Sequence, residues 1–183
     1  MMIQRAHVNR EEIMSNQSKP ASPSFKGLTW HRDQYYSFFA PMDWQRIMWP
    51  DGRQGIILLP DNDDLHTLFA VEVVDLGTDV TSDDVPYLAQ GLRDGIKALP
   101  ERNIEMTDEK VTGRLIELKA KYAFAEGEQR RKRWVRVFYF KGHQVTLTAQ
   151  GATEESYDYW LPMFNEAMMT AKIHDTMPEN PPA

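Results

Sequence analysis

The chain has 183 residues, of which 42% are hydrophobic and 26% charged, and its net charge is −6. This length and composition predict one globular domain with tails. The absence of cysteine excludes disulfides, thiolate metal sites and cysteine nucleophiles. The acidic balance argues against a general nucleic-acid binder, and no stretch approaches the ~20 apolar residues of a membrane span.

Both ends of the chain are predicted to lie outside the folded body. Residues 1–27 read as a disordered leader, because its second half is rich in serine, proline and other polar residues. Its first 13 residues either form a short amphipathic helix or precede a true start at Met14. The leader lacks the apolar segment of a secretory signal, so a cytoplasmic location is expected. Residues 175–183 read as a flexible, proline-rich tail. A single α+β domain over residues 28–174 remains.

The first element of this domain is the run "YYSFFAPMDW" at residues 35–44. Its aromatic residues stop at a proline and resume with a tryptophan. Two interpretations are open. The run is either a core strand that enters a turn, or an aromatic shelf on which a ligand stacks. The structural interpretation is favoured, because large aromatic residues most often contribute to a core.

Two strands and a helix follow. "GIILLPD" at 55–61 is a short apolar strand that ends at a proline, and "HTLFAVEVVDLG" at 66–77 alternates with the period of a half-buried strand. The period then changes to that of a helix over residues 81–100, where six apolar positions form one stripe. Thr81 with Asp84 predicts a capping box at its start.

The second half of the domain predicts three strands and a terminal helix. The strands are "RLIELKAKYAF", "KRWVRVFYFKG" and "QVTLTAQG", at 114–124, 132–142 and 144–151, joined by tight turns. The helix covers 153–173. The order of elements predicts an α+β fold in which both helices pack on a single antiparallel sheet of about six strands.

This pattern resembles the PsbP-like fold family, named for an extrinsic photosystem II protein. A Ran-binding nuclear-transport factor and bacterial DcrB-type domains share that fold. The resemblance is carried by "YSFFAPMDW" near the domain start and by "GATEESYDYWLPMFNEAM" near its end, and it covers most of residues 33–174. It implies binding or adaptor work more than chemistry. It carries no catalytic residues that map onto this chain.

The cluster with most resemblance to a metal site is "DNDDLH" at residues 61–66. Its oxygens suit a hard cation, but the glycine and distal glutamate of a calcium loop are missing. The other interpretation, which is favoured, is a solvated turn, because Asp and Asn form Asx-turns. The sequence contains no paired histidines, nucleophile elbow or phosphate-binding glycine motif. We therefore expect no catalytic residue, metal or cofactor.

The strongest charge feature is a basic run in one strand candidate. With two lysines of the preceding strand it could dock an acidic protein, an anionic lipid head group or RNA. The other interpretation, which is favoured, is a hairpin whose basic residues pair with neighbouring glutamates and protect a sheet edge. The candidate partner-binding residues are Arg130, Arg131, Lys132, Arg133, Trp134, Lys119 and Lys121.

Trp44 and Trp49 lie on either side of a short segment near the domain start. They are candidate pocket residues, because large apolar groups near turns often frame a cleft. Core packing is the alternative, and it is favoured more strongly for Trp44 than for Trp49.

These observations predict a non-enzymatic cytoplasmic binding or adaptor protein. It would engage a protein partner through a sheet face or the Trp-lined end, either as a monomer or as a homodimer. The DcrB-type relatives imply an accessory role in secretion or in chaperoning. The alternative is a small-molecule or lipid-binding module with a pocket between sheet and helix. Nucleic acid is not an expected partner.

Overall fold

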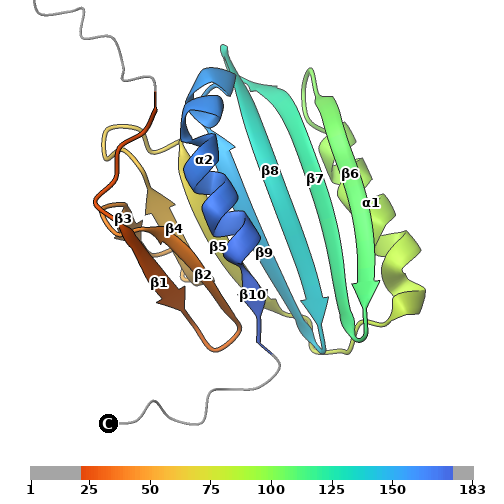
Figure 1. Cartoon of the computed structure of the whole chain (residues 1–183). Coiled ribbons are helices and arrows are strands. Elements are labelled where there is room, and N and C mark those ends of the chain that lie inside the picture. The colour runs from red at the N-terminus through yellow and green to blue at the C-terminus, as the bar shows by residue number, and fades with distance from the viewer. Residues whose placement is uncertain (1–21, 175–183) are drawn as a thin grey trace, which may run out of the picture.

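Residues 22–174 are described by a computed structural model (Figure 1). In this part of the chain one sheet has seven strands in the order β3-β4-β5-β9-β8-β7-β6, and a second has three in the order β1-β2-β10. The larger sheet is formed by β3 (Gln45–Ile47), β4 (Gln54–Leu59), β5 (Leu68–Asp75), β6 (Asn103–Thr112), β7 (Leu115–Glu126), β8 (Gln129–Phe140) and β9 (His143–Gly151). The smaller is formed by β1 (Leu28–Arg32), β2 (Tyr36–Pro41) and β10 (Lys172–Ile173). All paired strands are antiparallel.

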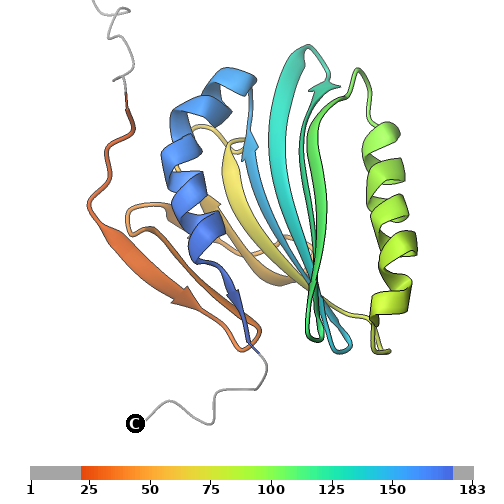
Figure 2. The same cartoon turned by 45° about the vertical axis from the view of Figure 1, so that its right-hand side comes forward.

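Two helices, α1 (Val85–Lys97) and α2 (Glu154–Thr170), lie on opposite faces of the seven-stranded sheet, as Figure 2 shows. A short 3-10 turn, η1 (Ser82–Asp84), precedes α1. The three-stranded sheet covers the far side of α2, so that α2 lies between two sheets. On this side the seven-stranded sheet is covered by two layers, α2 and the three-stranded sheet, whereas on the other side α1 is the outermost layer.

The alternation of β7 explains how one strand serves both helices. Ile116 and Leu118 point to α1 and pack with Val85 and Ala89, as a period of two requires. The intervening Glu117 points to the opposite face, where Arg136 Nε donates a hydrogen bond of 2.6 Å to its carboxylate. The same strand therefore supplies apolar contacts on one face and an ion pair on the other.

The largest core cluster fills the space around α2. It combines buried residues of α2 with residues from both sheets and from the connection between β2 and β3. Its members are Tyr36, Phe38, Ala40, Trp44, Ile56, Leu58, Phe69, Val71, Val73, Trp134, Phe138, Val145, Leu147, Ala149, Tyr157, Phe164, Ala167 and Met168. The start of α2 approaches the sheet so closely that a Cβ at Gly151 would lie 2.3 Å from the backbone nitrogen of Tyr157. Only glycine fits at this contact.

A capping box starts the 3-10 turn η1, which leads directly into α1, and a side-chain cap starts α2. The backbone and hydroxyl of Thr81 donate to Asp84 Oδ2 over 2.8 Å and 3.1 Å, which confirms the predicted capping box. The Thr153 hydroxyl accepts from the backbone N–H of Ser156 over 3.0 Å and caps α2. These caps fix where each helix starts relative to the sheet.

The α+β class is confirmed, with two helices and antiparallel strands. The strands divide between two sheets, however, because β1 and β2 pair with β10 after the terminal helix and not with the main sheet. The strand β6 has no counterpart among the predicted elements.

Most of the leader (1–21) and the tail (175–183) lie outside the described residues. No helix within 22–174 is long and apolar enough to cross a membrane.

Candidate functional site

The aromatic run at 35–44 is divided between the core and the surface. Tyr36, Phe38 and Trp44 are buried, as the core interpretation predicts. Phe39 points the other way and is 37% exposed. Its ring lies 4.3 Å from the ring of Trp30 on β1, measured between centroids, and Trp30 is 39% exposed. The run is therefore a core strand that also places one aromatic ring on the outer surface.

This outer surface is the hairpin patch, the exposed face of β1 and β2. Leu28 lies two residues before Trp30 on the same face of β1, and Met42 follows β2 and donates its backbone N–H to Gly27 over 2.9 Å. Phe25 precedes the strand and is also exposed. The hairpin patch is thus formed by Leu28, Trp30, Phe39 and Met42. A surface with this many large apolar groups together is typical of an interaction site.

The basic run lies on β8, where alternation sends its members to both faces of the sheet. Arg133 points to the α1 face, where it hydrogen-bonds Tyr122 and lies over the ring of Phe124. Lys132 points to the α2 face, where its ammonium contacts Glu105 at 3.1 Å and Asp158 at 3.7 Å. The run does not form one continuous patch.

The other basic residues of the run are also paired within the chain. Arg130 contacts Glu154 at 2.5 Å and donates to the Glu101 carbonyl, and Arg131 contacts Glu126 at 2.5 Å. Burial alone would lower the pKa of Lys132, but its carboxylate neighbours, Glu105 first, raise it instead. These ion pairs are of the kind expected from the hairpin interpretation. A role of the run in partner binding stays a prediction.

The remaining members of the basic group are held in place too. Lys119 contacts Glu117 at 3.5 Å and Asp108 at 3.6 Å. The ammonium of Lys121 lies 4.1 Å from the ring centroid of Trp134, a cation–π geometry. Trp134 itself is buried in the core on the α2 side. Its ring packs inside the protein and is not presented for stacking on a base.

Trp44 and Trp49 lie on opposite faces of the seven-stranded sheet. Trp44 is 6% exposed and meets Phe164 edge-on in the core around α2. Trp49 packs on the α1 face, donates its indole N–H to the Val71 carbonyl over 2.9 Å, and carries the guanidinium of Arg53 at 4.0 Å from its ring. The two tryptophans therefore do not line a common pocket.

The aspartate cluster at 61–66 forms the loop between β4 and β5. Asp61 accepts the backbone N–H of Asp63 over 2.9 Å, and Asp64 accepts those of His66 and Thr67. Burial alone would raise the pKa of Asp64, but these bonds and the Thr67 hydroxyl lower it. Such contacts define Asx-turns. Within residues 22–174 no three His, Asp or Glu side chains are arranged to hold a metal ion.

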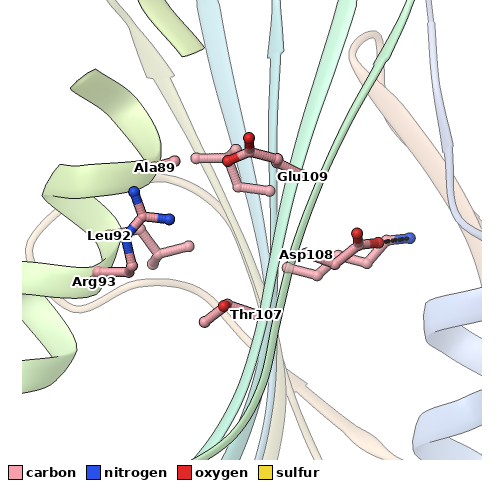
Figure 3. Close-up of a pocket in the computed structure, with 8 residues that line it drawn as sticks. Ala89, Leu92, Arg93, Thr107, Asp108 and Glu109 are labelled. Atoms are coloured by element: carbon pink, nitrogen blue, oxygen red, sulfur yellow. Dashed lines mark ion pairs between the residues drawn. The ribbon is translucent and has the colours of Figure 1, made fainter. Parts of the chain in front are cut away.

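A hollow of about 430 Å³, the α1 hollow, lies between α1 and the centre of the seven-stranded sheet. Tyr87 of α1 lines this hollow, and its side chain is 79% exposed. Burial raises the pKa of Tyr139, so its hydroxyl stays protonated there and can donate a hydrogen bond. The lining residues are Glu72, Tyr87, Leu88, Gly91, Leu92, Tyr122, Val135, Val137, Tyr139, Gln144 and Thr146. On the other flank of α1 a hollow of about 240 Å³ faces β6 (Figure 3).

Sequence reasoning missed the hairpin patch, and it named a pocket between sheet and helix only as an alternative, without any of the residues that line the α1 hollow. Trp30 gives no signal alone, because its exposure depends on the pairing of β1 with Phe39 of β2. Tyr87 did give a signal, since it lies off the apolar stripe of the helix and a large aromatic residue there must face solvent or a partner.

Comparisons with known proteins show similarity only at the level of structure. No family model and no curated protein matches the chain. It is similar to the solution structure of cyanobacterial PsbP (CyanoP) from Synechocystis sp. PCC 6803, with a TM-score of 0.56, 15% identity and coverage of 87% of this chain and 96% of that one. It is also similar to LpqN of Mycobacterium tuberculosis, involved in cell envelope biogenesis, with a TM-score of 0.53, 15% identity and coverage of 80% and 90%. The chain therefore has the PsbP-like fold.

Proposed function

We propose that the chain is a non-enzymatic binding protein that engages a protein partner through the hairpin patch. The observation that carries this proposal is the exposed Trp30–Phe39 pair, together with Leu28 and Met42 on the same hairpin. Tryptophan is among the residues that contribute most to binding energy at protein interfaces. A partner that covers this face would remove large apolar groups from water at little conformational cost.

The backing of the hairpin patch makes it a rigid platform. Phe38 and Tyr36, on the inner side of β2, are buried in the core around α2. The Thr170 hydroxyl at the end of α2 accepts the backbone N–H of Phe39 over 3.0 Å. Because the strand is held from behind, its outward rings are already in place before a partner arrives, and pre-organisation of this kind favours binding.

The test is a native pull-down from the source cell with a variant that removes the two rings, Trp30→Ser with Phe39→Ser. A matched control, Tyr87→Ser with Val74→Ser, removes exposed apolar groups elsewhere. We expect the wild type and the control to retain the same partner and the hairpin variant to lose it. Equal capture by all three would contradict the proposal. Circular dichroism of each variant checks that it is folded.

The structure also shows which variant to avoid. Reversing the charges of residues 130–133 would break the ion pairs with Glu154, Glu126 and Glu105. A loss of binding in that variant would then report a disturbed sheet as readily as a lost docking surface. Trp30→Ser and Phe39→Ser avoid this problem, because neither side chain takes part in an ion pair.

A second candidate function is a small-molecule or lipid-binding module that uses the α1 hollow. The specific observation is its volume of about 430 Å³, with apolar, tyrosine and amide side chains in its wall. Known ligand pockets have volumes of roughly 300–1,000 Å³. A Cβ at Gly91 would meet no atom within 4 Å, so a side chain can be added at this lining position, and Gly91→Phe is the variant chosen to occupy the hollow. Native mass spectrometry should then show a co-purified ligand in the wild type and none in this variant.

A further inference from the structure

The strand β6 forms a long free edge of the seven-stranded sheet. It is the last strand in the order and pairs with β7 alone among the described residues. The register with β7 shifts between Ile104 and Met106 and is then unbroken to Thr112. In Figure 1 the strand runs along one side of the sheet, with α1 behind it. The straight segment available for further pairing is therefore 106–112.

An edge of this kind presents one row of unpaired backbone N–H and C=O groups. An extended strand that adds to it satisfies these groups, and its side chains must match those of β6 on each face. The question is which strand matches. The side chains of β6 itself provide an answer, because the strand is complementary to a second copy of itself.

We propose that two copies of this chain pair through β6, antiparallel, about a two-fold axis at Glu109. Glu109 is the midpoint of the unbroken segment 106–112. This register places every residue of the segment opposite a partner and joins the two large sheets into one continuous sheet. The contact is isologous, so it closes as a dimer and does not extend into a filament.

The charges of β6 fit this register. Opposite residues lie on the same face of a sheet, and Asp108 and Lys110 share one face, where they oppose Lys119 and Glu117 of β7. About an axis at Glu109, Asp108 of each copy faces Lys110 of the other. The dimer therefore gains two pairs of opposite charge. On the other face Thr107 meets Val111, two β-branched side chains that suit adjacent strands.

Neighbouring registers place like charges together. A shift of the axis to residue 108 sets the two Asp108 carboxylates against each other, and a shift to residue 110 does the same for the two Lys110 ammonium groups. A two-fold axis pairs only residues that point to the same face, so no register about such an axis turns one sheet over relative to the other. Of these three registers only the axis at Glu109 forms pairs of opposite charge, and the charges therefore favour it.

The selected register has one unfavourable pair, Glu109 against its own copy. Figure 3 shows Glu109 and Arg93 at the hollow of about 240 Å³ between α1 and β6. Each copy brings an arginine to this face together with the glutamate. The positive charge of Arg93 at the same hollow reduces the repulsion between the two carboxylates.

The experiment is sedimentation of the full chain over a wide concentration range. We expect the wild type to associate from its 21.3 kDa monomer to a species of twice that mass. Lys110→Glu or Asp108→Lys alone creates two like-charge pairs in the homodimer and should weaken association about tenfold or more. In an equimolar mixture of the two variants every acidic residue at positions 108 and 110 faces a basic one, so association should return. Lys97→Glu, an equal charge change on α1, should have no effect.

Three results would overturn the proposal. They are a wild type that remains monomeric at all concentrations, single variants that associate as the wild type does, and a mixture that does not recover. A second measurement needs no variant. Hydrogen exchange of the wild type should slow at backbone amides of 106–112 as concentration rises, with no change at β3, the opposite edge. Exchange at 106–112 that is independent of concentration would overturn the proposal even if a variant failed to fold.

Discussion

The two faces of the seven-stranded sheet are built differently. On the α2 face the helix is itself covered by β1, β2 and β10, and the buried residues form one continuous cluster. On the α1 face the buried residues fall into three smaller clusters, and hollows flank the helix. A hollow of about 390 Å³ also lies on the α2 face, beside the end of the helix, so the two faces differ in the cover and continuity of their cores and not in the presence of hollows. The comparison indicates that a buried side chain contributes more to stability on the α2 face, where layers lie on both sides of the helix.

The largest effect is expected from Phe164→Ala, at the centre of the α2 face. Phe164 is fully buried, and its ring centroid lies 5.9 Å from that of Trp44 and 5.7 Å from that of Tyr157. The substitution should lower the free energy of unfolding by about 4 kcal/mol, because layers on both sides prevent the cavity from collapsing. Urea denaturation measures this loss. A loss below about 1 kcal/mol would contradict the assignment of the main core to this face.

The next largest effect is expected from Arg136→Met, beneath the end of α2. The guanidinium pairs with the buried Glu117 and also donates to the carbonyl of Met168. Removing it leaves a buried carboxylate whose one remaining cation among the described residues is Lys119, at 3.5 Å, and should cost about 3 kcal/mol of stability. The double variant Glu117→Leu with Arg136→Met should recover most of this loss. A double variant as unstable as the single one would contradict the ion-pair explanation.

A smaller effect is expected from Ile96→Ala on the α1 face. Ile96 is buried against Ala120 and Val135 in one of the small clusters. The substitution should destabilise the protein by about 2 kcal/mol, because α1 has no layer behind it and can settle toward the sheet. Urea denaturation beside Phe164→Ala makes the comparison direct. An Ile96→Ala loss equal to or larger than that of Phe164→Ala would reverse the ranking of the two faces.

The smallest effect is a pH dependence confined to the three-stranded sheet. Burial, followed by Arg46, lowers the pKa of His31, and burial, followed by Arg32, lowers that of His174. The folded state therefore favours neutral imidazoles. This contribution to stability is complete above the unfolded pKa of about 6.5 and declines as the pH falls through 6.5 toward the depressed folded values.

Hydrogen exchange at about pH 7.5 and about pH 5.5, corrected for the intrinsic rate, measures this decline. Protection of β1 and β2 should fall more than that of β8 and β9. His31→Phe keeps a ring against Phe38, whose centroid lies 5.1 Å from that of His31, and should remove part of the dependence. Equal loss of protection in both sheets would show that these histidines are not its origin.

The sequence predicted those elements whose apolar residues recur with a clear period. The helix α1 shows one apolar stripe and a capping box, and β7 alternates along its length. By contrast β6 is exposed on both faces, so its sequence carries no period. The strand β10 has two residues and exists only because it pairs with β2. Elements defined by pairing alone give no local signal.

The candidate sites follow the same rule. The basic run was recognised from composition, but its division between two faces depends on strand direction, and several of its partners lie far away in the chain, as Glu154 and Asp158 do. The hairpin patch was missed because Trp30 and Phe39 come together only across two strands. Local sequence identifies charged and aromatic residues, whereas tertiary contacts decide whether they are available to a partner.

The pairing of β2 with β10 has a consequence for how the chain folds. Tyr36 opposes Ile173, so the smaller sheet joins the first and last strands of the domain. Contacts between residues so distant in sequence are slow to form, whereas the hairpins from β6 to β9 need only short loops. During synthesis the smaller sheet cannot close until the last strand has left the ribosome. Until then the inner side of β2, including Phe38, has no complete cover, and the nascent chain exposes the surface that α2 later buries.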